Sequence, residues 1–186
     1  MSLLNEQELR LLARSKKPIY ETAQQTIKKS FNNFSVFQNY DVFLSHAYND
    51  SEVILGLCYF IEGLGYSVYL DWKDDPQLNR SKVTPQTANT LRIRMKQSKC
   101  LLFATSENSS SSIWMPWELG FFDALKGRVG VIPLASKINS PDTFEGQEYL
   151  GLYNYVVKTG QSLYVHSSAS SSVTFSQWLN QKISPG

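Results

Sequence analysis

Short apolar runs alternate along this chain with longer segments in which apolar residues recur at helical spacing. The four clearest runs are YDVFLS, YSVYLDW, KCLLFATS and RVGVIPL, at residues 40–45, 66–72, 99–106 and 128–134. Continuous apolar runs of this length, rich in β-branched and aromatic residues, are typical of buried strands in a parallel sheet. Residues 153–157 and 163–165 are candidates for a fifth strand.

Helical segments separate these strands. Residues 49–51 form an Asn-Asp-Ser cluster suited to begin a helix, and glycines at positions 63 and 65 are suited to end it. Further helices are predicted at residues 84–97, 114–126 and 174–182. Strand and helix alternate repeatedly, so we expect an α/β fold with a central parallel sheet of about five strands and helices on both faces.

The N-terminal segment precedes this alternation. Leucines and other apolar residues at helical spacing within residues 3–34 predict helix, with a break at Pro18. We therefore expect a helical extension at residues 1–38, packed on the domain or on a partner, and the α/β domain itself at residues 39–186.

Composition narrows the class of protein. The 186 residues carry a formal net charge of +2, and their Lys and Arg residues are spread along the chain, which argues against a nucleic-acid partner. No segment approaches the roughly 18 apolar residues that a membrane-spanning helix needs, and the first residues lack the layout of a secretory signal. These features predict a cytoplasmic protein with no membrane association.

Cysteine and histidine usage argues against metal chemistry. Cys58 and Cys100 each lie in an apolar segment, as buried thiols do, and neither His46 nor His166 has the spacing of a metal ligand. The glycine-rich fingerprints of dinucleotide-binding and P-loop enzymes and the serine elbow of α/β-hydrolases are absent from the sequence. We expect no metal and no bound cofactor.

Polar and aromatic residues follow the predicted strands at one edge of the sheet. In open parallel sheets, ligands bind outside the carboxyl ends of the strands. The strand ends and the helix start at residue 114 supply the candidate ligand-binding residues, which are Ser45, His46, Asp71, Trp72, Ser106 and Trp114.

Several of these residues have alternative structural roles. His46 could contact a nucleotide or cap a loop. Asp71 could hold a ribose hydroxyl and Trp72 could stack on a base, or both could brace the following loop. The basic residues of the predicted helix at 84–97, among them Arg94, are expected to form a solvated face.

The ordered set of motifs resembles TIR (Toll/interleukin-1 receptor) domains. DVFLSHA at 41–47 is similar to their first strand and loop, and GYSVYLDW at 65–72 to the second strand that leads into the so-called BB loop. WMPWELG at 114–120 matches the W-x-x-x-E arrangement of TIR domains that hydrolyse NAD. The resemblance runs from about residue 40 to the end of the chain. It is closest to stand-alone bacterial TIR proteins such as those of Thoeris antiphage systems.

This resemblance implies a flavodoxin-like fold and a role for Glu118 as the catalytic carboxylate that breaks the nicotinamide–ribose bond of NAD⁺. In the family, products are ADP-ribose or cyclic and conjugated ADP-ribose signals read by an effector, and members self-associate through the BB loop and helices. One departure is Ala47, where some animal relatives have an arginine. Phosphate contacts therefore do not transfer from those relatives.

The implied chemistry is compatible with one carboxylate. Nicotinamide leaves NAD⁺ as a neutral molecule, so no general acid is needed, unlike in ordinary glycoside cleavage. Trp114 and Glu118 would share a helix face, and Pro116 would place them in the first turn, where the helix dipole favours an anion. The same residues could be only a capping acid and a core tryptophan.

Three functions are therefore carried forward. The first is an NAD⁺ nucleosidase or ADP-ribosyl cyclase in antiphage defence, with NAD⁺ as substrate. The second is a non-catalytic TIR adaptor, and the third is a nucleoside deoxyribosyltransferase-like enzyme, which shares the layout and also uses one glutamate.

Overall fold

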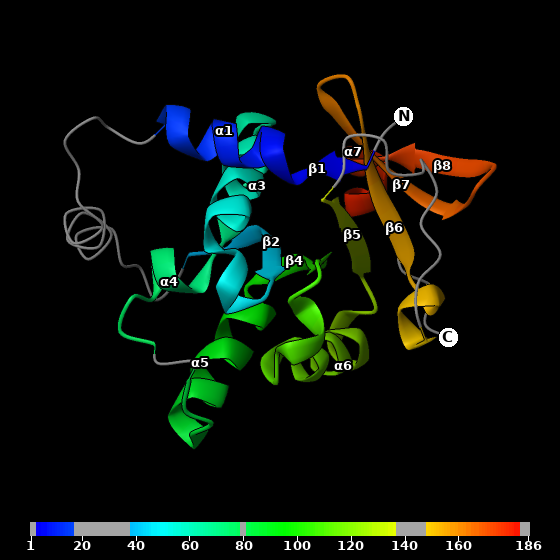
Figure 1. Ribbon diagram of the computed structural model, residues 1–186. Coiled ribbons are helices and arrows are strands. Elements are labelled where there is room, and N and C mark those ends of the chain that lie inside the picture. Colours follow the sequence, from blue (N-terminus) through cyan, green and yellow to red (C-terminus); the bar gives the residue numbers. More distant parts are fainter. Residues whose placement is uncertain (1–2, 17–37, 79–80, 137–147, 183–186) are drawn as a thin grey trace.

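The apolar runs assemble into a sheet in the computed structural model, which describes residues 3–16, 38–78, 81–136 and 148–182 (Figure 1). Within that part of the chain the strand order is β3-β2-β4-β5-β6-β7-β8, and β1 pairs with β5. The strands are β1 (Leu4–Asn5), β2 (Tyr40–Ser45), β3 (Val68–Tyr69), β4 (Ser98–Thr105), β5 (Val129–Ala135), β6 (Asn154–Thr159), β7 (Ser162–Ser168) and β8 (Ser171–Thr174).

Helices lie on both faces of this sheet. They are α1 (Glu6–Lys16), α3 (Ser51–Gly63), α4 (Asp71–Asp74), α5 (Pro85–Lys96), α6 (Trp114–Lys126) and α7 (Phe175–Asn180). Short 3₁₀ turns occur at η1 (Tyr48–Asp50), η2 (Ser109–Ser111) and η3 (Glu148–Leu152). Local sequence fixes several ends: the Thr84 side chain accepts the first-turn N–H of Thr87 at 3.1 Å, and Gly127 ends α6 with φ of 61°.

The strand order determines where a ligand can bind. β3, β2, β4, β5 and β6 are parallel, with the first strand of the alternation, β2, between β3 and β4. This is a flavodoxin-like order, in which successive connections leave β2 in opposite directions. The connections that follow the neighbouring strands β2 and β4 run to opposite faces of the sheet, and the point between them is the switch point. Ser45 at this end of β2 is in register with Phe103. The predicted α/β class and flavodoxin-like sheet are confirmed.

Two apolar layers hold the helices to the sheet. One layer joins α1, α3 and α7 to the strands and contains Ile54, Leu57 and Trp178. The other joins α5 and α6 to the opposite face through Met95 and Phe122. Figure 1 shows α1 and α3 on one side of the strands and α5 and α6 on the other. Helix α6 thus reaches the carboxyl end of β2 from the face opposite α3.

The second strand is shorter than the sequence pattern predicts. Only Val68–Tyr69 pairs as β3, and the expected strand end at Asp71 and Trp72 is instead the start of α4. The Asp74 carboxylate accepts the Leu70 N–H at 2.7 Å, which closes a helical turn where an extended strand was expected.

The N-terminal segment is only partly helical. Leu4–Asn5 pairs in parallel with β5, so the expectation of helix throughout residues 3–34 is wrong at its start. Helix α1 follows and packs against α3, where a Cβ on Gly56 would lie 1.9 Å from the Leu9 carbonyl oxygen. Residues 17–37 lie outside the described part, and the domain division at residue 38 stays a prediction.

Candidate active site

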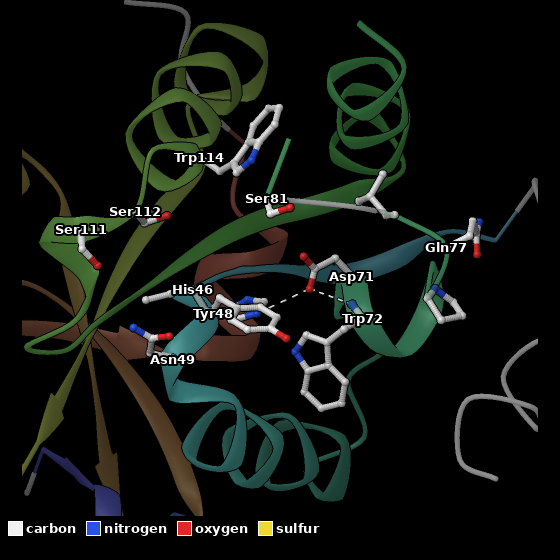
Figure 2. Close-up of a pocket in the computed structure, with 13 residues that line it drawn as sticks. His46, Tyr48, Asn49, Asp71, Trp72, Gln77, Ser81, Ser111, Ser112 and Trp114 are labelled. Atoms are coloured by element: carbon white, nitrogen blue, oxygen red, sulfur yellow. Dashed lines mark hydrogen bonds and ion pairs between the residues drawn. The ribbon is translucent and has the colours of Figure 1, made fainter. Parts of the chain in front are cut away.

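A pocket of about 740 Å³ lies at the carboxyl ends of the central strands (Figure 2). Its walls come from the β2–α3 connection, from α4 and the loop after it, and from the segment that enters α6. The lining residues are His46, Ala47, Tyr48, Asn49, Asp71, Trp72, Pro76, Gln77, Leu78, Ser81, Ser111, Ser112 and Trp114. Its volume falls in the range of small-molecule sites.

His46 and Asp71 form a buried polar pair in this pocket. The His46 Nδ1 lies 2.9 Å from the Leu44 carbonyl oxygen, and its Nε2 lies 3.5 Å from the Asp71 Oδ1. The same Asp71 oxygen accepts the Trp72 N–H at 2.8 Å, which fixes the carboxylate at the start of α4. Both side chains are at most 5 % exposed. The β2 end and α4 are therefore joined at the pocket by their own polar groups.

Glu118 lies behind the pocket wall, in contact with Ser45. The Ser45 hydroxyl donates a hydrogen bond of 2.6 Å to the Glu118 Oε2, and both residues are fully buried. Trp114, one helical turn earlier on α6, does line the pocket. Glu118 lies beyond the first turn, where the effect of the helix dipole has weakened, so the Ser45 hydroxyl is the stronger stabilising influence.

Ser106 was predicted to bind the ligand, but its side chain contacts the loop after β2 instead. Its hydroxyl donates to the Asp50 carboxylate, which also accepts a hydrogen bond of 2.6 Å from the Asn108 side chain. Ser106 does not line the pocket. It connects the loop after β4 with the loop after β2, and so holds the two sides of the switch point together.

The segment that carries Asp71 and Trp72 is anchored by a buried ion pair. Arg94 donates from Nε and Nη2 to the two Asp75 oxygens at 2.8 and 2.9 Å, and the Tyr69 hydroxyl donates to Asp75 at 2.9 Å. The hydrogen bond to Asp75 raises the pKa of Arg94, and burial raises the pKa of Tyr69. The expectation that Arg94 belongs to a solvated face is therefore wrong, since it is 3 % exposed.

Several pocket residues were not predicted from the sequence. Tyr48 and Asn49 directly follow the predicted strand end, and Gln77 and Ser81 belong to the loop after α4. Their position beside His46 and Trp72 in the chain is the only signal that could have marked them. Residues 79 and 80, in the same loop, are outside the described part of the chain.

Thiol and metal chemistry are not supported in the described part of the chain. Burial raises the pKa of the Cys58 thiol to about 12 and also raises that of Cys100, so neither is a ready nucleophile. Among the described residues no group of three or more His, Cys, Asp or Glu side chains could hold a metal ion. In the same residues, no helix has the length and apolar character needed to cross a bilayer.

The flavodoxin-like strand order places the pocket at the switch point of an open α/β domain, with a buried glutamate on the helix after β4. The chain is 48% identical over 167 residues to the "Probable 3′ cyclic ADP-D-ribose synthase ThsB′" of Bacillus cereus (strain MSX-D12), covering 87% of this chain and 86% of that protein. It therefore belongs to the bacterial TIR-domain family that includes ThsB′.

A second relative matches a shorter region. The "Putative cyclic ADP-D-ribose synthase TIR2" of Cytobacillus dafuensis is 38% identical over 91 residues, which are 48% of this chain and 24% of that protein. Among solved structures, the TIR domain of the Toll-related receptor TRR-2 from Hydra magnipapillata aligns over 57% of this chain and 78% of its own, with a TM-score of 0.41 and 20% identity. No protein-family model matches the chain.

Proposed function

We propose that this protein cleaves the nicotinamide–ribose bond of NAD⁺ and rejoins the ribose to form a cyclic ADP-ribose signal in bacterial antiphage defence. The observation that carries the proposal is the buried Ser45–Glu118 pair beside the pocket, in a chain 48% identical to ThsB′. NAD⁺ is the substrate, and the reaction needs no bound cofactor. We place the protein in the cytoplasm, where NAD⁺ is available.

Glu118 is the catalytic carboxylate in this proposal. When the C–N bond breaks, its electron pair goes to the pyridinium ring, and a positive charge develops on the ribose carbon and ring oxygen. A buried carboxylate held by the Ser45 hydroxyl stabilises that charge. Glu118 is fully buried, so contact with the ribose requires a rearrangement of the side chains around it.

The pocket residues position the rest of the substrate. Asp71 can accept a hydrogen bond from a ribose hydroxyl. The Trp72 ring lines the pocket, and its buried Nε1 has no hydrogen-bond partner among the described residues. An unpaired buried donor is unfavourable, so we propose that it donates to an oxygen atom of NAD⁺.

Self-association belongs to the same proposal. Three apolar side chains near the pocket entrance are exposed: Tyr48 at 79 %, Val83 at 70 % and Ile113 at 63 %. Such a group of exposed apolar residues favours contact with another copy of the chain through the loop after α4 and the adjoining helices. The nucleotide product would then be read by a separate effector protein.

The burial of Glu118 is the observation that favours the adaptor as a second candidate. The test is NAD⁺ consumption by wild type and by Glu118→Gln, with nicotinamide and nucleotide products separated by mass. We expect wild type to release nicotinamide and the variant to lose activity by a factor of about 10² or more, since it keeps the side-chain shape but not the charge. Absence of nicotinamide release from concentrated wild type would favour the adaptor.

A further inference from the structure

We propose that His46, together with Asp71, takes the proton from the hydroxyl group that attacks the ribose carbon after nicotinamide has left, and so directs the reaction to the cyclic product. This inference rests on the proposed function. It assigns His46 a chemical step, in place of the general substrate-contacting or loop-capping role that the sequence leaves open.

The first observation is the hydrogen bond that fixes the tautomer of His46. A carbonyl oxygen can only accept, so the contact of 2.9 Å with the Leu44 oxygen requires the proton on Nδ1. In the neutral ring, Nε2 then carries the lone pair. A histidine held in this way is a proton acceptor with a defined orientation.

The second observation is what surrounds Nε2. It lies 3.5 Å from the Asp71 Oδ1, a distance too long for a strong hydrogen bond, and both residues line the pocket. Figure 2 shows the contact between the two side chains inside the pocket wall. An attacking hydroxyl can therefore donate towards both acceptors, and the imidazolium that forms is stabilised by the neighbouring carboxylate.

The proton balance of the reaction explains why an acceptor is needed. The C–N bond breaks and its electrons leave with neutral nicotinamide. A sugar hydroxyl of the ADP-ribose part then forms the new C–O bond, and its proton must leave the oxygen. The proton passes to the His46 Nε2 and later to water, which returns the neutral ring.

Glu118 is poorly placed for this second role. It already accepts the Ser45 hydroxyl, and in the proposed function its negative charge stabilises the ribose cation. Attack by water can pass its proton to other water molecules, whereas a sugar hydroxyl enclosed in the pocket depends on a protein acceptor. Loss of the base should therefore reduce ring closure more than hydrolysis.

The test uses His46→Asn in the full chain. The Asn amide can still donate to the Leu44 carbonyl, but it cannot take a proton at the position of Nε2. The measured quantity is the ratio of cyclic product to nicotinamide released, with NAD⁺ as substrate. We expect this ratio to fall by a factor of about 10² in favour of linear ADP-ribose, within the usual range for loss of a general base.

His166→Asn is the matched control. His166 is also buried, at 4 % exposed, and its Nδ1 faces the main-chain carbonyl of Ser168 two residues away, but it does not line the pocket. Its replacement should leave the product ratio unchanged. Asp71→Asn is the second variant, and we expect it to lower the ratio in the same direction as His46→Asn.

Azide distinguishes a chemical role of His46 from a structural one. Azide is an anionic nucleophile with no proton to lose, so its attack needs no base. We expect His46→Asn and wild type to form the azide adduct of ADP-ribose at similar rates per nicotinamide released. An adduct yield that falls together with the cyclic product would overturn the proposal.

The remaining outcomes separate this inference from the proposed function. Wild type that releases no nicotinamide contradicts both. Wild type that releases nicotinamide but makes only linear ADP-ribose contradicts the inference and the cyclisation step of the proposed function, but not NAD⁺ cleavage. An unchanged product ratio in the variants at positions 46 and 71 contradicts the inference alone.

Discussion

At the scale of single residues, the site is defined by the hydrogen-bond partners of its buried polar groups. Ser45 satisfies one oxygen of a fully buried glutamate, and the Leu44 carbonyl fixes the ring of His46. Trp72 is the contrasting case, because its buried Nε1 has no partner in the described residues. A buried donor left unpaired is unfavourable, and this is the basis of the proposal that the Trp72 N–H donates to NAD⁺.

Trp72→Phe tests this reading of the indole N–H. The change keeps an aromatic ring against the pocket and removes the donor. We expect the KM for NAD⁺ to rise by a factor of about 5, since one hydrogen bond contributes about 1 kcal/mol, while kcat changes less. The thermal midpoint should stay close to wild type, because loss of packing is offset by removal of an unsatisfied donor. Steady-state kinetics and calorimetry measure the two effects.

The control is Trp117→Phe on α6, whose ring lies under the Arg92 guanidinium and outside the pocket. This variant should keep the KM of wild type. An unchanged KM in Trp72→Phe would show that the indole N–H does not contact the substrate.

At the scale of secondary structure, the sequence predicted elements well and their ends less well. The apolar runs identified β2, β4 and β5 because continuous burial leaves a clear pattern, and the helices predicted at residues 84–97 and 114–126 agree with α5 and α6 to within one residue. After Tyr69 the apolar pattern predicted strand, but the structure has helix. The Asp74 carboxylate closes a helical turn there through one hydrogen bond, and the spacing of apolar residues carries no information about such a contact.

The candidate site shows the same limit. Position after a strand was enough to place His46, Asp71, Trp72 and Trp114 at one pocket. It was not enough to show that Ser106 bonds Asp50 instead, because that depends on which loop lies opposite. Nor could charge alone reveal that Arg94 is buried, since its partner Asp75 is nineteen residues away in the chain.

Helix α4 gives a prediction for the pH dependence of stability. Burial raises the pKa of Asp74 from its ordinary 3.8 to about 6. Between these two values the folded protein holds a proton that the unfolded chain has lost, so the stability that this group contributes is present below 3.8 and lost as the pH rises through 6. Asp74→Asn stays neutral and avoids this loss.

We therefore expect the melting temperature of Asp74→Asn, relative to wild type, to increase from pH 4 to pH 7 and to level off above about pH 6.5. Asp41→Asn is the control, because the pKa of Asp41 is shifted in the opposite direction. Burial alone would raise this pKa, but bonds from Lys99 and Ser67 lower it below 3.8, so the stability that Asp41 contributes is lost only at lower pH and the difference from wild type should stay nearly flat from pH 4 to pH 7. Parallel thermal melts across this pH range measure both, and a flat difference for Asp74→Asn would contradict the assignment.

At the scale of the whole molecule, the strand order brings the first and third parallel strands together and opens the pocket where their connections diverge. The pocket entrance is the part of the described surface where exposed apolar residues and the substrate site coincide. Val83 and Ile113 are 70 % and 63 % exposed there, although neither contributes to a core layer. A second copy of the chain packed on this surface would cover them and close the site against water.

Activity should therefore depend on protein concentration more steeply than in direct proportion. Ile113→Asp tests the surface with little effect on α6, because Ile113 is exposed, precedes the helix, and leaves the Ser112 hydroxyl that accepts the Met115 N–H in place. We expect this variant to keep its melting temperature and to lose NAD⁺ cleavage by a factor of about 10 or more at dilute concentration, since a buried unpaired charge opposes the contact.

Leu11→Asp on α1 is the matched control. Leu11 is 65 % exposed but lies on a helix that does not line the pocket, so the activity of this variant should equal that of wild type. Sedimentation and activity measured over the same dilution series connect assembly to chemistry. A specific activity that stays constant on dilution, in wild type and Ile113→Asp alike, would mean that one chain forms the complete site by itself.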